Sequence, residues 1–211
     1  MGRNRQPVKL NMKRIILSFL LLFIITISVK QSALAYSSDP KKFIEEIIEE
    51  AKVVLSSGSS QDIKAKELSK IANKTVDVQG LAYYTLGKKR KEISPKELEK
   101  YKNLFEKYFL KSFTSRLTDY SDPKIDVLSS ETVSDKYTIV KTMLLKTSKK
   151  PEVKIDWRVY TKNPEKPLIR DLIVEGLSLA RTQKEEFASI LSSNNNDINV
   201  LFETLEIFIN K

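Results

Sequence analysis

The chain has 211 residues and contains neither cysteine nor histidine. These absences exclude disulfide frameworks, thiol nucleophiles, Ser-His-Asp triads and histidine-ligated metal sites. The formal net charge is +10, but residues 1–35 hold six of the 37 basic residues and none of the 27 acidic ones, so residues 36–211 carry only +4 and nucleic-acid binding is not indicated.

The first 35 residues have the pattern of a cleavable signal peptide. A basic segment precedes the apolar residues 15–29, and Ala-Leu-Ala at residues 33–35 supplies the small-x-small pattern of a cleavage site. A membrane-spanning helix needs about 20 apolar residues, so this run is short for an anchor, which is the alternative. We expect cleavage after Ala35 and export of residues 36–211 as one domain, which without cysteine has no lipoprotein anchor. Translation from Met12 would serve equally well.

Four helical segments are predicted next. Asp39 is an N-cap followed by proline, and it opens an amphipathic helix that ends at Gly58. The others are predicted at residues 62–72, at residues 77–86 before Gly87, and from the capping box Ser94-Pro95-Lys96-Glu97 to residue 117.

The hydrophobic period then changes to two, which is typical of strands. Strands are predicted at residues 125–133, 137–148, 153–160 and 168–175, and the short turns between them indicate an antiparallel meander. Two helices follow, one capped by Thr182 and one over residues 197–209. The predicted class is α+β: a curved four-stranded antiparallel sheet with about six helices on one face. Both faces of residues 137–148 are partly apolar, so the face that meets the helices is left open.

Three polar features have plain structural interpretations. The glycines of Gly80 to Gly87-Lys88-Lys89 do not follow a strand, and Lys89 replaces the Ser/Thr of a phosphate loop, so a helix and its C-cap are predicted. The acidic run Glu45 to Glu50 is expected to be a solvated helix face. The basic residues 88–91 either contact anionic headgroups or an acidic partner, or form a solvated turn. No constellation indicates an enzyme.

The segment Asp171-Leu-Ile-Val-Glu175-Gly176-Leu-Ser178-Leu resembles the MlaC family of periplasmic phospholipid carriers, also called toluene-tolerance auxiliary transport proteins. In that family a helix with Arg-x-x-Phe follows, and Lys184-Glu-Glu-Phe187 stands in that place. The resemblance covers roughly residues 38–209. Gln183-Lys184 replaces the usual Tyr-Arg, which weakens a bidentate or stacking role of that arginine. Asp171 and Glu175 are expected to bond backbone amides at the turn through Gly176, and a catalytic pair of carboxylates is the alternative.

The resemblance implies a non-enzymatic shuttle in the periplasm of a double-membraned bacterium. It would carry phospholipid between an outer-membrane lipoprotein complex and an inner-membrane ABC transporter, without cofactor, metal or nucleic acid. It also implies an apolar cavity between sheet and helices for the acyl tails. The candidate lining residues are the large apolar ones: Tyr84, Leu86, Tyr101, Phe105, Phe109, Phe113, Val140, Leu144, Ile155, Trp157, Val159, Leu172, Val174 and Phe187.

Periodicity alone favours a filled core over a cavity. A periplasmic adaptor with a closed core, binding only protein, is therefore an alternative function. A second alternative is the hopanoid-associated branch of the same family, whose ligand would be a polycyclic lipid. An enzyme comes third, and it would have to work with carboxylates, tyrosine or lysine.

Overall fold

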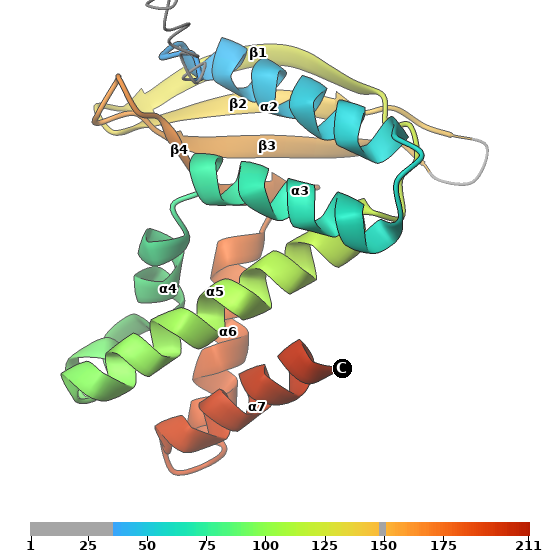
Figure 1. Ribbon diagram of the computed structural model, residues 1–211. Coiled ribbons are helices and arrows are strands. Elements are labelled where there is room, and N and C mark those ends of the chain that lie inside the picture. Colours follow the sequence, from blue (N-terminus) through green and yellow to red (C-terminus); the bar gives the residue numbers. More distant parts are fainter. Residues whose placement is uncertain (1–35, 148–150) are drawn as a thin grey trace, which may run out of the picture. The chain divides into compact units, whose positions relative to one another are not determined.

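The structure is a computed structural model that describes residues 36–147 and 151–211, in which helices precede and follow one antiparallel sheet (Figure 1). The predicted signal peptide, with its cleavage site after Ala35, lies outside the described residues, as does Ser148 at the end of the predicted second strand. The α+β class is confirmed, and within the described residues so is the number of about six helices.

The helices begin where local caps place them. Before the sheet they are α2 (Pro40–Ser56), α3 (Gln61–Thr75), α4 (Val78–Leu86), the 3₁₀ helix η1 (Gly87–Lys91) and α5 (Pro95–Leu117). Asp39 accepts a hydrogen bond from the Lys42 amide at 2.8 Å, and Ser94 and Glu97 form the predicted capping box. Gly87 ends α4 with a φ of +59°, a conformation that favours glycine.

The sheet has five strands, so the predicted four-stranded sheet is wrong. In chain order and in spatial order these are β1 (Ile125–Ser134), β2 (Tyr137–Leu144), β3 (Val153–Tyr160), β4 (Leu168–Val174) and β5 (Leu177–Ser178). The additional strand forms because Glu175 and Gly176 both have positive φ, 49° and 83°, and make a two-residue hairpin turn. Glutamate rarely adopts this conformation, so the turn is not evident from the sequence.

Other boundaries also differ from the prediction, most of all at β2 and α6. Strand β2 ends at Leu144, four residues early. Helix α6 (Leu179–Ser192) begins before the predicted cap at Thr182, because the hydroxyl of Ser178 accepts a hydrogen bond from the Arg181 amide at 3.1 Å. The last helix, α7 (Ile198–Asn210), follows Asp197 as its N-cap.

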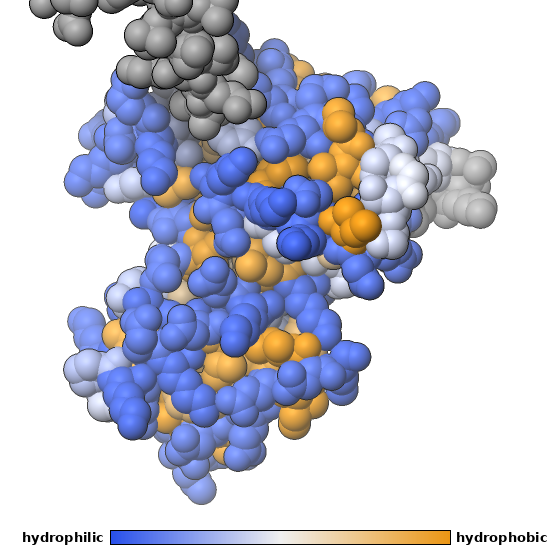
Figure 2. Space-filling model, in the orientation of Figure 1, coloured by the Kyte–Doolittle hydropathy of each residue, from blue (hydrophilic) through white to orange (hydrophobic). Residues whose placement is uncertain are grey.

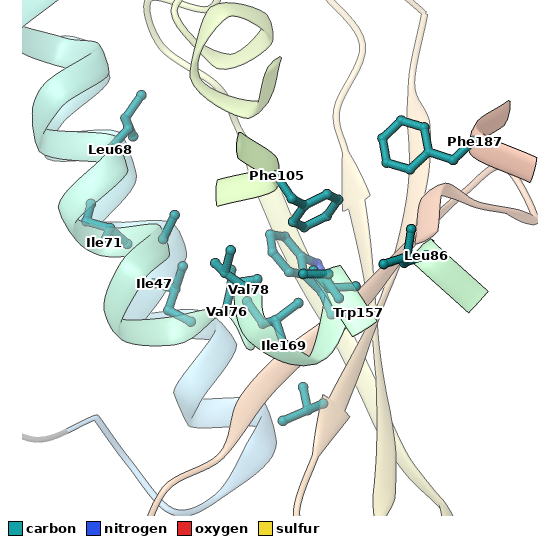
Figure 3. Close-up of a cluster of buried hydrophobic side chains, with 14 of the residues drawn as sticks. Ile47, Leu68, Ile71, Val76, Val78, Leu86, Phe105, Trp157, Ile169 and Phe187 are labelled. Carbon is teal, nitrogen blue, oxygen red and sulfur yellow. The ribbon is translucent and has the colours of Figure 1, made fainter. Parts of the chain in front are cut away.

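Helices and sheet share one hydrophobic core. Helix α2 packs on β1 and β2 and against α3, while α6 packs beside β4 and β5. Helices α4, α5, α6 and α7 pack on one another (Figure 1). Figure 3 shows Trp157 of β3 among side chains from α4, α5 and β4, including Val78, Phe105 and Ile169. Burying each such side chain stabilises the fold by about 1.5–3 kcal/mol.

Candidate functional site

The alternation of burial along β2 identifies the face of the sheet that meets the helices. Thr138, Val140 and Thr142 are buried, whereas Ile139 and Lys141 between them are only partly buried. Because side chains alternate between the two faces of a strand, Val140 and Leu144 point toward the helices. We call this the inner face of the sheet.

Half of the candidate residues lie on the inner face. Val140 is paired with Trp157, and Trp157 with Leu172; in the next row Ile155 is paired with Val174. Cross-strand partners point to the same side of a sheet, so the apolar surface is continuous over β2, β3 and β4. The seven candidates on this face are Val140, Leu144, Ile155, Trp157, Val159, Leu172 and Val174.

Burial divides the inner face into two parts. Val140, Trp157 and Val159 are at most 9% exposed and belong to the closed core. Four other candidates are only partly buried: Leu144, Ile155, Leu172 and Val174. We call these four residues the open half of the inner face. It lies toward the end of the sheet where β2 finishes and β3 begins.

A column of three phenylalanines on α5 shows the same gradient. The rings of Phe105, Phe109 and Phe113 follow one another every four residues, with centroids 6.2 and 5.8 Å apart and planes tilted by 18° and 9°. Phe105 is 2% exposed, whereas Phe109 and Phe113 are partly buried against the core. The column therefore leads from the closed core to an apolar surface that solvent reaches.

The other aromatic candidates close the core between α4, α5 and α6. The ring of Phe187 lies 6.3 Å from those of Tyr101 and Phe105, edge to face with both. The hydroxyl groups of Tyr101 and Thr85 are hydrogen-bonded at 2.8 Å, and Leu86 is buried beside them. Burial raises the pKa of Tyr101 well above its ordinary value near 10.

Tyr84 lies apart from the other candidates. Its side chain is 42% exposed on α4, and the Lys184 ammonium lies 5.0 Å from the centre of its ring. The sequence did not reveal this placement, because the short helix α4 is apolar on more than one side.

In the segment from Asp171 to Ser178 that resembles the MlaC family, polar contacts connect the start of α6 to β4. The side chain of Asp171 is 2% exposed and accepts hydrogen bonds from the Ser178 hydroxyl at 2.6 Å and the Ala180 amide at 3.0 Å. Arg158 lies 3.7 Å from the same carboxylate. Glu175 accepts a hydrogen bond from the Lys154 amide. The contacts of Asp171 hold the first turn of α6 in place, the contact of Glu175 joins the β4–β5 turn to β3, and none of them involves the inner face.

One polar cluster was missed by the sequence analysis. Arg170 donates to Asp77 at 2.6 Å and to the Tyr137 hydroxyl at 3.1 Å, and its guanidinium lies 3.5 Å from the ring centre of Tyr160. Asp77 is also the N-cap of α4, where it accepts from the Gly80 amide at 2.9 Å. The cluster therefore joins the start of α4 to the sheet across 93 residues of sequence, a separation that no local pattern reveals.

Two hollows in the described part of the chain lie away from the candidate residues. One is a groove of about 350 Å³ between α2 and β1, and the other, of about 540 Å³, lies along α7; none of the fourteen candidates lines either. Within residues 36–147 and 151–211, no helix is long and apolar enough to cross a membrane. No group of three or more acidic residues in that part of the chain is placed to hold a metal ion.

Comparison with known proteins gives one family and one fold. Residues 41–206 match the profile of the family described as MlaC protein. The solved structure of a phospholipid-binding protein from Ralstonia solanacearum, in complex with a phospholipid, has a TM-score of 0.69 and 15% sequence identity. The similarity covers 82% of this chain and 97% of the Ralstonia chain. No curated protein is similar enough in sequence to match.

Proposed function

Because this chain belongs to the MlaC family, we propose that it is a non-enzymatic carrier that binds a phospholipid by its acyl tails and moves it through the periplasm. The similar Ralstonia protein, which was solved with a phospholipid bound, supports this ligand class. The observation that carries the proposal is the pair of half-buried apolar surfaces, the open half of the inner face and the outer end of the phenylalanine column.

The free-energy cost of exposing the acyl tails to water determines how much of them these surfaces must cover. Two tails of about 16 carbons, at about 0.8 kcal/mol per methylene, lose on the order of 25 kcal/mol of favourable burial when exposed to water. A carrier must therefore cover nearly all of both tails. It must also release them to a bilayer that covers them equally well, which favours an apolar slot over specific polar bonds.

The dimensions of the inner face suit a tail. One leaflet of a bilayer is about 15 Å thick in its hydrocarbon part. The inner-face residues from Val140 to Leu144 extend over about 13 Å at the usual rise of a strand. A tail laid along β2 or β3 would therefore reach from the rim of the open half to the buried Trp157.

Entry of a lipid requires the core to open. We infer that Phe109 and Phe113 move away from the sheet, because they are only partly buried, whereas Phe105 stays in place at the closed end of the column. The fully buried Tyr101, Phe187 and Leu86 hold α4, α5 and α6 together during this movement. The slot would then open only as the tails enter between the sheet and the helices. This agrees with the two hollows, neither of which is lined by a candidate residue.

The location and partners follow from the same proposal. Residues 1–35 would direct export and be removed after Ala35. Lipid would be exchanged with an outer-membrane lipoprotein complex and with an inner-membrane ABC transporter, which would supply the energy.

A protein-binding adaptor with a closed core is the second candidate function. It is favoured by the burial of five candidates in the closed core, namely Leu86, Tyr101, Phe105, Trp157 and Phe187. Purification followed by solvent extraction and mass spectrometry separates the two. A phospholipid in stoichiometric amount supports the carrier, and a polycyclic lipid would indicate the hopanoid-associated branch. Protein that is free of lipid and binds none when it is added would refute both kinds of lipid carrier and support the adaptor.

The single tryptophan gives a direct test of where the tails lie. Trp157 is next to Leu172 of the open half, so phospholipids with brominated tails should quench its fluorescence. The variant I207S is a control for lipid that binds to exposed apolar side chains, since Ile207 is a 59% exposed apolar residue on α7, outside the proposed slot. In this variant the fluorescence of Trp157 should be quenched as much as in the unchanged protein. Binding without quenching would place the tails elsewhere.

A further inference from the structure

The end of α4 and the helix η1 carry a dense group of cations beside two exposed tyrosines. The group comprises three residues of η1, one residue of the adjacent α6, and the two rings at the end of α4: Lys88, Arg90, Lys91, Lys184, Tyr83 and Tyr84. We call these six residues the basic surface. In the view of Figure 2, mainly hydrophilic residues cover the region over η1 and the start of α5.

The charges of the basic surface are not neutralised. Lys89, which is also in η1, pairs with Glu92 at 3.4 Å, and Lys102 pairs with Glu99 at 2.8 Å. Across the ranges that the structure describes, no carboxylate forms an ion pair with any of the four cations of the basic surface. Four positive charges are therefore available to an external anion.

The tyrosines are held among these cations. Tyr83 and Tyr84 are 40% and 42% exposed. Arg90 donates a hydrogen bond to the carbonyl of Tyr83 at 2.8 Å, and the Lys184 ammonium lies over the Tyr84 ring. A Cβ at Gly87 would lie 3.4 Å from Cε of Lys184, an ordinary contact distance, so the Lys184 side chain lies close to the start of η1. The rings and the cations thus form one surface built from α4, η1 and α6.

We propose that the basic surface docks the protein on the anionic surface of a lipid bilayer. Interfaces between proteins have a core from which charges are depleted, and lysine is rare in them, whereas this surface has three lysines and no aliphatic centre. Clustered lysine and arginine are attracted to anionic headgroups, and tyrosine suits the boundary between headgroups and tails. This docking is independent of whether the protein carries a lipid.

Vesicle co-sedimentation tests the proposal. The protein is residues 36–211, which form a unit with its own core and lack the apolar segment that would itself bind lipid. The vesicles contain either phosphatidylglycerol with phosphatidylethanolamine or phosphatidylcholine alone. Each basic residue near an anionic bilayer raises binding about fivefold, so K88Q/R90Q/K91Q should bind about 100-fold more weakly.

The matched control removes the same charge elsewhere. Lys136, Lys162 and Lys166 are exposed in loops of the sheet, and the Thr161 amide bonded to the Lys136 carbonyl shows that the two loops adjoin. K136Q/K162Q/K166Q should bind anionic vesicles within about threefold of the unchanged protein, since these lysines lie outside the basic surface. Circular dichroism and thermal unfolding establish that both triple variants are folded.

The outcomes separate the possibilities. Binding to anionic but not neutral vesicles, lost in 0.5 M salt and weakened only by the η1 variant, supports the proposal. Equal weakening by both triple variants would reduce the effect to net charge and overturn it. Failure to bind anionic vesicles at low salt would also overturn it, and would leave an acidic protein as the partner of this surface.

Discussion

The indole Nε1 of Trp157 donates a hydrogen bond to Oγ1 of Thr142 at 3.0 Å, across the boundary between β3 and β2. The same hydroxyl donates to the carbonyl of Ile155 at 2.9 Å. Both partners are buried, Thr142 completely. The bond fixes the indole ring where the closed part of the inner face meets the open half.

Replacing Thr142 with valine should destabilise the protein. The substitution preserves the shape of the side chain but leaves the buried indole N–H without an acceptor, which lowers the free energy of unfolding by about 1–3 kcal/mol. Thr138→Val is the matched control, since Thr138 is also buried on β2 and its side-chain hydrogen bond, to Thr132, is long at 3.4 Å. Urea unfolding should show a clearly smaller loss for the control; equal losses would assign the effect to β2 rather than to the bond.

A second prediction concerns the carboxylate that holds α6. Asp171→Ala removes the acceptor of the Ser178 hydroxyl and the Ala180 amide and leaves Arg158 without its partner. Because the carboxylate is buried, the free energy of unfolding should fall by about 3 kcal/mol. Asp126→Ala, on an exposed residue of β1, should change it by less than about 0.5 kcal/mol. A small loss for Asp171→Ala would mean that Ser178 alone is enough to start α6.

These contacts also show how far the sequence could predict the fold. The caps at Asp39 and Ser94 were predictable because their partners lie three residues away. The start of α6 was not, because Ser178 is held by Asp171 from another strand, and its alternative, Thr182, has equally good local features. The fifth strand was hidden by the positive φ of Glu175.

The sequence could predict which residues belong to the candidate site better than how these residues are arranged and buried. Alternation placed Ile155, Trp157 and Val159 on one face, which the register of the sheet confirms. Periodicity carries no information about how completely a face is covered. The difference between buried Phe105 and partly buried Phe113, on the same stripe of α5, depends on which elements pack beside each turn.

A third prediction is a loss of stability at alkaline pH through Tyr101. Burial raises the pKa of Tyr101, so above pH 10 the unfolded chain releases this proton while the folded protein keeps it. The unfolded state then binds fewer protons, and the free energy of unfolding falls by about 1.4 kcal/mol per pH unit. Tyr101→Phe should remove this part of the slope in urea unfolding between pH 10 and 11.

Tyr101→Phe should change the stability of the protein only slightly at neutral pH. Thr85, the partner of the Tyr101 hydroxyl, still donates to the carbonyl of Leu81 at 2.8 Å, so it is not left unsatisfied. Stability at pH 7 should therefore change by no more than about 1 kcal/mol. Tyr83→Phe, at a 40% exposed position, is the control and should keep the original slope. An unchanged slope in Tyr101→Phe would show that other groups cause the alkaline loss.

The last prediction separates the core from the proposed slot along the phenylalanine column. Phe105→Ala should lower the free energy of unfolding by about 3–5 kcal/mol, because it leaves a cavity in the closed core. Phe113→Ala, on a partly buried ring, should lower it by only about 1–2 kcal/mol. Loss of its contact with a bound tail should nevertheless weaken phospholipid binding about tenfold, measured by quenching of Trp157 with brominated lipid.

Phe208 supplies the control for this comparison. It is also a partly buried phenylalanine, but it lies on α7 against Tyr108, with ring centroids 4.8 Å apart and away from the column. Phe208→Ala should cost about as much stability as Phe113→Ala and leave lipid binding unchanged. If both variants weakened binding equally, the effect would follow stability and the outer end of the column would not be part of the slot. A tenfold loss in Phe113→Ala alone ties the half-buried rings of α5 to the lipid.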